Sequence, residues 1–227
     1  RNTRLAHANF PLPLNNVGGT LRLRPGRIDV AHIEGRYRDC SVTATGSLAG
    51  APGAEAAHVT VTCRDLPLDN ALKTALPPHL AEAARDFDLA GSVDTITTLD
   101  QTPSSNGFNT RQETDIQLSG ASLRHAAFPL PLTNVRGRVV VADDHATFEN
   151  VTAEHGNARF TLDGELTQTP ARTTGSARLV AIGLTFDEDL RQAVPWRWRR
   201  TWNNLQPAGA VNLDLPGIRY EREASEP

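Results

Sequence analysis

Phe10-Pro11-Leu12-Pro13-Leu14 recurs 118 positions later as Phe128-Pro129-Leu130-Pro131-Leu132. The sequence around this pentapeptide aligns with itself at the same offset and without a gap. Between residues 5–93 and 123–211 we count 23 identities in 89 aligned positions. Because an ungapped alignment of this length preserves the spacing of every element, the sequence predicts two tandem copies of one unit of about 118 residues.

Apolar and polar residues alternate through most of each copy. Residues 40–48 show this alternation in the first copy, and residues 158–166 show it in the second. A period of two is typical of β-strands with one apolar face. Similar alternation predicts strands over 17–24, 57–63, 88–96, 112–124, 134–142 and 208–215. Pro25-Gly26 and the equivalent Asp143-Asp144 are turn residues, which favours an antiparallel sheet with short connections.

One segment of each copy has a helical spacing instead. Apolar side chains recur every three or four residues after Asp69 and again after Asp187. Aspartate is a preferred residue at helix N-caps. We therefore expect helices over 69–86 and 187–205, so that each copy contains about six strands and one amphipathic helix. The polar stretch 100–110 is predicted to be a long, mobile loop.

Composition excludes several classes of protein. Hydrophobic residues make up 39% and charged residues 22% of the chain, and no apolar run reaches the ~20 residues of a membrane-spanning helix. The net charge of −3, with no basic run longer than Arg199-Arg200, argues against nucleic acid as a partner. The chain contains no Met and begins at Arg1. We expect it to be a fragment of a longer protein, with residues 1–110 as the first repeat unit and 111–227 as the second.

Residues suited to catalysis do not occur in the usual motifs. The sequence has no Gly-x-Ser-x-Gly, no glycine-rich phosphate loop and no His-Glu-x-x-His. Asp143-Asp144-His145 is interpreted as a solvated turn, because the first copy has Pro25-Gly26-Arg27 at that position. His7 and His125 are equivalent, but neither has a second ligand nearby in the sequence. We expect no catalytic residue, no cofactor, no metal and no enzymatic activity.

The two cysteines are predicted to lie on one face of neighbouring strands. Pairing Leu48 with Ala57 across the turn at 49–56 would place Cys40 diagonally opposite Cys63. Two interpretations stay open at this point. The pair forms a disulfide in an oxidising compartment, or it remains as two separate core thiols.

A tryptophan- and arginine-rich run, 195–202, has no counterpart in the first copy. In one interpretation Trp198 and Trp202 pack on the sheet, and Arg197 and Arg200 face water. In the other, the run forms a lip that meets lipid headgroups or a partner protein, and the residues of this lip are Trp196, Arg197, Trp198, Arg200 and Trp202.

The repeated strand-and-turn pattern resembles the AsmA-like family, which is related to TamB and, more distantly, to bridge-like lipid transfer proteins. The residues that carry the resemblance are Phe128-Pro-Leu-Pro-Leu-Thr-Asn-Val-Arg-Gly137, a strand, a two-residue turn, a second strand ending near Glu154, and then Ala158-Arg-Phe-Thr-Leu-Asp-Gly-Glu-Leu166. Both copies show it over nearly the whole chain. The resemblance implies an antiparallel sheet curled into a U-shaped trough with an apolar inside.

The same resemblance implies a function. It suggests a periplasmic segment of a bacterial cell-envelope protein that carries phospholipid between the inner and outer membranes or assists outer-membrane assembly. The partners would be phospholipid acyl chains and, through parts of the protein outside this chain, both membrane surfaces, with an inner-membrane anchor among those parts. If the sheet is such a trough, the alternating residues expected to line it are Val42, Ala44, Leu48, Val59, Val61, Phe160, Leu162, Leu166 and Leu179.

A second hypothesis is a structural or adhesive surface repeat that binds a protein or a glycan. In that case the helices would cover the apolar sheet face completely. The two hypotheses differ in one feature, which is whether a strip of apolar side chains remains uncovered along the sheet.

Overall fold

The structure is a computed structural model of the chain and describes residues 5–7, 10–51, 53–75, 86–169 and 171–223. The described residues form a mainly β architecture with three short helices. The strands are β1 (Leu5–His7), β2 (Phe10–Arg24), β3 (Arg27–Tyr37), β4 (Cys40–Ala51), β5 (Ala54–Pro67), β6 (Ser92–Ser104), β7 (Gly107–His125), β8 (Phe128–Ala142), β9 (His145–His155), β10 (Ala158–Gln168), β11 (Arg172–Thr185) and β12 (Ala210–Glu223). The helices are α1 (Asn70–Ala75), α3 (Glu188–Ala193) and α4 (Trp196–Leu205).

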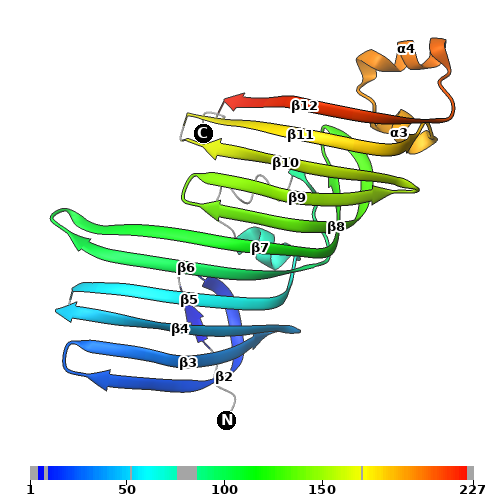
Figure 1. Cartoon of the computed structure of the whole chain (residues 1–227). Helices are drawn as coiled ribbons and strands as arrows, with labels where there is room; N and C mark the ends of the chain where they lie inside the picture. Colours follow the sequence, from blue (N-terminus) through cyan, green and yellow to red (C-terminus); the bar gives the residue numbers. More distant parts are fainter. Residues whose placement is uncertain (1–4, 8–9, 52, 76–85, 170, 224–227) are drawn as a thin grey trace. The chain divides into compact units, whose positions relative to one another are not determined.

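The order of strands in the sheet follows the order of the chain, from β1 to β12, and the sheet is open (Figure 1). Neighbouring strands whose register is defined pair antiparallel. Two-residue turns at Pro25-Gly26 and Asp143-Asp144 join β2 to β3 and β8 to β9. The predicted antiparallel sheet with short connections is therefore confirmed.

The chain forms two compact units, each built from separate stretches of sequence. Unit 1 contains Arg1–Pro67, Val93–Gln117 and Val140–Asp143. Unit 2 contains Leu68–Ser92, Leu118–Val139 and Asp144–Pro227.

Element bounds recur at the offset of 118 found in the sequence. The strands β2, β3 and β5 begin and end 118 positions before β8, β9 and β11, and α1 has the same relation to α3. Equivalent hydrogen bonds recur as well. Asp65 N–H donates to Asp94 Oδ1 at 2.8 Å, and Gly183 N–H donates to Asn212 Oδ1 at 2.8 Å. The superposition of the two copies in three dimensions stays a prediction.

The expected loop over 100–110 is wrong. Strand β6 continues to Ser104, Ser105 and Asn106 form a tight turn, and β7 begins at Gly107. The Thr and Gln residues of this stretch are compatible with an exposed strand. A hairpin needs only a short turn, so the stretch does not have to form a long loop. Gly107 has a φ of +127°, a conformation that residues with side chains rarely adopt.

The expected single helix over 187–205 is also wrong, because α3 ends at Ala193 and α4 begins at Trp196. Pro195 causes the break. Proline disfavours the helical region for the preceding residue, and Val194 has an extended ψ of 130°. In the first copy, α1 covers the beginning of the predicted helix 69–86, while residues 76–85 lie outside the described part of the chain.

Candidate functional site

The paired strands of unit 1 place apolar residues on one face. Residues that pair directly across strands point to the same side of a sheet. Following the pairs from β2 to β5 gives rows without a charged side chain. We call this surface the unit 1 face, and its rows are Leu23, Ile28, Leu48 and Ala57; Leu21, Val30, Gly46 and Val59; and Gly19, Ile33, Ala44 and Val61.

Unit 2 has a corresponding face across β9, β10, β11 and β12. The pairing of these strands again produces rows without a charge. This unit 2 face consists of the rows Ala146, Leu166, Gly175 and Tyr220; Phe148, Gly164, Ala177 and Ile218; Val151, Leu162, Leu179 and Leu215; and Ala153, Phe160, Ala181 and Leu213.

Burial on the unit 2 face falls from one end of the strands to the other. Ala153, Phe160 and Ala181 are buried at the end where α3 follows β11. Val151 in the next row is also buried, and the other residues of the farther rows on β9, β10 and β11 are half-buried. On β12, Leu215 is 43% exposed and Tyr220 is 41% exposed. Apolar side chains therefore remain accessible over the part of the face that lies away from α3.

The unit 1 face shows the same gradient. Val42 and Cys63 are buried, Ala44 and Val61 are half-buried, and Leu23 at the far end is 75% exposed. Large contiguous apolar patches on a protein surface often mark binding sites.

Glycines at equivalent positions of the two faces lie close to the backbone of the next strand. A Cβ added to Gly164 would lie 2.5 Å from Ser176 O and 2.9 Å from Ala177 Cα, which are backbone atoms of the next strand. Gly46 would meet the backbone of His58 and Val59 in the same way. These glycines allow close approach of neighbouring backbones and leave a low point between the larger apolar side chains.

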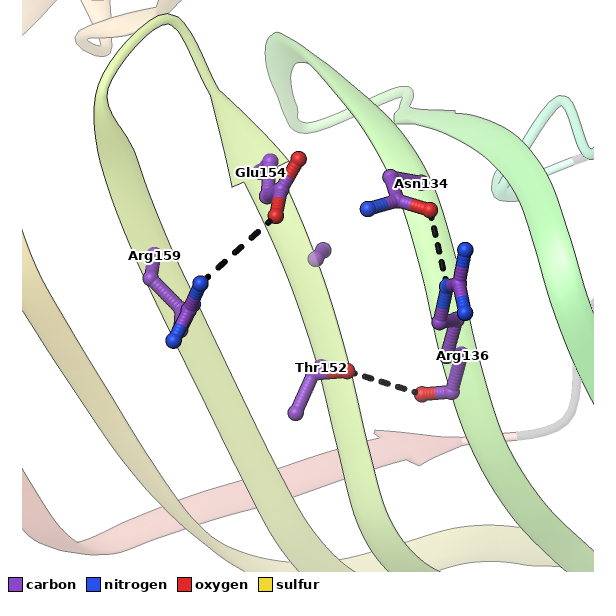
Figure 2. Close-up of a pocket in the computed structure, with 6 residues that line it drawn as sticks. Asn134, Arg136, Thr152, Glu154 and Arg159 are labelled. Carbon is purple, nitrogen blue, oxygen red and sulfur yellow. Dashed lines mark hydrogen bonds and ion pairs between the residues drawn. The ribbon is translucent and has the colours of Figure 1, made fainter.

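The opposite face of the unit 2 sheet is polar. Arg178 donates two hydrogen bonds to Asp214, at 3.1 and 2.7 Å, and the Arg178 guanidinium lowers the pKa of that carboxyl. Figure 2 shows a shallow pocket among β8, β9 and β10, where Arg136 Nε donates to Asn134 Oδ1 at 2.8 Å and Arg159 lies 4.0 Å from Glu154. Exposed pairs of this kind contribute little to stability, and they mark the solvent side of the sheet.

The predicted lining residues all occur in these rows or in the next row of unit 1. In that next row Val42 pairs with Gly35 and Cys63. Residues Leu213 to Tyr220 of β12 also contribute to the unit 2 face, which alternation in the sequence did not predict. Strict alternation after Leu215 would put Ile218 and Tyr220 on the other face, but the register shifts between the pairs Ala177–Ile218 and Leu179–Leu215. The signal for this shift is the adjacent Pro216-Gly217.

Cys40 and Cys63 lie as the pairing of Leu48 with Ala57 predicted. That pair is present, Val42 pairs with Cys63, and Cys40 is the diagonal neighbour. Both cysteines are buried free thiols in this structure. Burial, followed by the effect of the neighbouring Cys63, raises the pKa of the Cys40 thiol to about 12. The thiolate needed for disulfide exchange is therefore scarce at neutral pH.

The tryptophans of α4 have different environments. Trp202 is half-buried and makes an edge-to-face contact with Phe186, with ring centroids 5.5 Å apart. Trp196 is 82% exposed and Trp198 is 55% exposed, which does not fit the interpretation in which Trp198 packs on the sheet. Pro195 separates α4 from α3. Arg197 and Arg200 are exposed.

His155 is the buried polar residue of the described chain. Its Nδ1 lies 2.9 Å from Pro131 O, and its Nε2 lies 3.2 Å from Asp187 Oδ2. The Leu190 amide donates to Asp187 Oδ1, and this hydrogen bond is the main cause of the lowered pKa of Asp187. The cluster fastens α3 to the ends of β8 and β9, which is a structural role.

Among the described residues no group of three or more His, Cys, Asp or Glu is arranged to hold a metal ion. None of the helices in the described ranges is both long and apolar enough to cross a bilayer.

Comparisons with family models, with curated proteins and with solved structures give no match for this chain.

Proposed function

We propose that this chain is a segment of an AsmA-like bacterial cell-envelope protein whose apolar sheet faces hold phospholipid acyl chains. In this proposal the chain works in the periplasm, in phospholipid transport between membranes or in outer-membrane assembly, and has no catalytic step. The sheet would curl as a U-shaped trough around the lipid. The observation that carries the proposal is the accessible apolar face present in each unit.

The shape of each face supports a chain-like ligand. Large side chains such as Ile28, Leu48 and Phe148 alternate with Gly46 and Gly164, which leaves low points along the strands. A closed core is filled with large residues at native packing density, whereas a ligand site needs unfilled width. The rows also contain no hydrogen-bonding side chain except the hydroxyl of Tyr220 at the margin.

Burial of apolar surface would stabilise the complex with an acyl chain. Removing a methylene from water contributes ~0.8 kcal/mol, so partial enclosure of an acyl chain yields several kcal/mol. At the same time, covering Leu21, Val30 and Val59 removes from water apolar surface that the fold leaves accessible. Both gains favour a complex that persists through purification.

A double substitution on the unit 1 face tests the proposal. Ala44→Glu with Val59→Glu places two carboxylates among the apolar rows, where an acyl chain would have to desolvate them. We expect phospholipid to co-purify with the wild-type chain and to fall at least about tenfold in the variant, since burying one carboxylate costs more than the ~1.4 kcal/mol that this factor represents. Mass spectrometry of the extracted lipid measures the difference.

The matched control uses the same two strands and the other face. Thr43 and Thr60 are diagonal neighbours there, as Ala44 and Val59 are on the apolar face. Thr43→Glu with Thr60→Glu should leave bound lipid unchanged, and circular dichroism should show strand content close to wild type for both variants. A wild-type chain that neither carries phospholipid nor extracts it from vesicles would contradict the proposal and favour the structural or adhesive surface repeat.

A further inference from the structure

Helix α4 lies in the connection between β11 and β12 (Figure 1). No residue of α4 is buried. Trp196 is 82% exposed, Trp198 is 55% exposed and Leu205 is 72% exposed. Exposed tryptophan is uncommon on a surface that meets only water, because burying an indole removes a large apolar area from water. We call Trp196, Arg197, Trp198, Arg200 and Leu205 the α4 surface.

The position of α4 is fixed by other contacts. Arg199 donates hydrogen bonds to Gln192 O at 3.1 Å and to Val194 O at 3.3 Å, which ties the start of α4 to the end of α3. Trp202 packs edge-to-face on Phe186. Because these two side chains hold the helix, the remaining tryptophans and arginines are not needed for its attachment.

Two of the arginines are available to a ligand. Arg197 and Arg200 make no hydrogen bond or ion pair with any residue that the structure describes. The sequence contains no acidic residue between Asp189 and Asp214. The α4 surface is thus locally cationic although the net charge of the chain is −3. A matching binding partner would have anionic groups at its surface and apolar groups below them.

The spacing of the apolar residues favours a membrane over a protein groove. Trp198, Trp202 and Leu205 occur at helical positions i, i+4 and i+7 and therefore share one stripe. Trp202 already contacts Phe186, so only two anchors of the stripe remain for a partner. A groove-bound helix uses three or four such anchors, whereas tryptophan and arginine together suit the headgroup region of a bilayer.

From these contacts and charges we infer that α4 docks the chain on the surface of an anionic phospholipid bilayer. Arg197 and Arg200 contact lipid phosphates, and Trp198 and Leu205 enter the boundary between headgroups and acyl chains. This docking goes beyond the proposed trough and does not depend on it, because it uses none of the residues of the two sheet faces.

Tryptophan fluorescence reports on the α4 surface directly, because the three tryptophans of the protein are Trp196, Trp198 and Trp202. Vesicles of phosphatidylethanolamine and phosphatidylglycerol are the probe. We expect them to shift the emission to the blue and to sediment the protein, with weaker binding at high salt because salt screens the charges. Arg197→Gln with Arg200→Gln should weaken binding roughly 10- to 30-fold, at ~1 kcal/mol per arginine. Trp198→Gln with Leu205→Gln should abolish the blue shift.

The control is Phe108→Gln with Arg111→Gln, which removes an exposed aromatic side chain and an exposed arginine from β7 in unit 1. This control should bind vesicles like the wild type. Absence of the blue shift, or equal binding to vesicles of phosphatidylcholine alone, would overturn the inference. Lipid content after purification, measured on the same samples, tests the trough separately, so either proposal can fail without the other.

Discussion

Asp187 shows how one side chain can organise the start of a helix and its attachment to the sheet. Its Oδ1 accepts a hydrogen bond from the Leu190 amide at 2.8 Å, as an N-cap does. Its Oδ2 accepts from Thr185 Oγ1 at 3.1 Å and lies 3.2 Å from His155 Nε2. The equivalent Asp69 makes the same cap, because the Leu72 amide donates to Asp69 Oδ1 at 2.8 Å. The prediction of both caps from sequence is confirmed.

Asp187→Ala should destabilise the protein by about 1–2 kcal/mol at neutral pH, because the cap hydrogen bond and the two side-chain contacts are lost together. Hydrogen bonds lower the pKa of Asp187 in the folded state. A lowered folded-state pKa gives stability above the ordinary carboxyl pKa of about 4, and this stability is lost as the pH falls through the folded value. Urea unfolding should therefore show a difference between the two proteins that shrinks in acid.

Asp189→Ala is the matched control for this experiment. Asp189 is an exposed acid in the same helical turn, and it has no partner among the described residues. The control should change stability by less than about 0.5–1 kcal/mol, which is the size of a helix-dipole effect. An Asp187→Ala protein as stable as this control would contradict the role given to the cap.

Gly164→Ala should destabilise the sheet by roughly 1–3 kcal/mol, which is typical of overpacking. The new Cβ would meet Ser176 O at 2.5 Å and Ala177 Cα at 2.9 Å, and backbone atoms cannot move aside as a flexible side chain can. Gly217→Ala on β12 is the control, because its Cβ would have nothing within 4 Å. Thermal unfolding of both variants checks the difference, and equal losses would show that the close approach at Gly164 does not matter.

At the level of elements, alternation in the sequence predicted most of the strands and one register. Leu48 does pair with Ala57, and this pair fixes the side on which Val42, Ala44 and Cys63 lie. A strand with one apolar face allows little freedom, because a slip of one residue would turn every apolar side chain to water. This is why the sequence was sufficient for β4, β5 and β10.

Local breaks in the pattern were harder to predict from sequence. The hairpin at Ser105-Asn106 lies between polar strands, so no alternation distinguished it from a loop. The helical spacing of apolar residues continues on both sides of Pro195. For this reason the spacing alone predicted one helix and not the break between α3 and α4. Ile218 and Tyr220 of β12 lie on the unit 2 face because the register shifts near Pro216-Gly217. Strict alternation does not predict such a shift.

For the whole molecule, the compact units do not follow the two sequence repeats. Unit 2 takes Leu68–Ser92 from the first copy and combines this segment with residues of the second copy. Ala90 and Ser122 exchange two backbone hydrogen bonds of 2.9 Å, and the Arg124 amide donates to Phe87 O at 3.0 Å. Asp86 accepts hydrogen bonds from the Ala126 amide at 2.7 Å and from Arg222 at 3.0 Å. These contacts join segments that a cut between residues 110 and 111 would separate.

Residues 111–227 produced alone should therefore be less stable than the same residues in the intact chain. The fragment loses these hydrogen bonds to residues 86–90, at about 1 kcal/mol each. At 2–4 °C per kcal/mol for a chain of this size, its melting temperature should fall by roughly 10–20 °C. Adding residues 1–110 should restore part of this loss, because the missing segment returns with them. Circular dichroism melts of the fragment, the mixture and the intact chain measure the effect, and a fragment that melts with the intact chain would show that the second copy folds by itself.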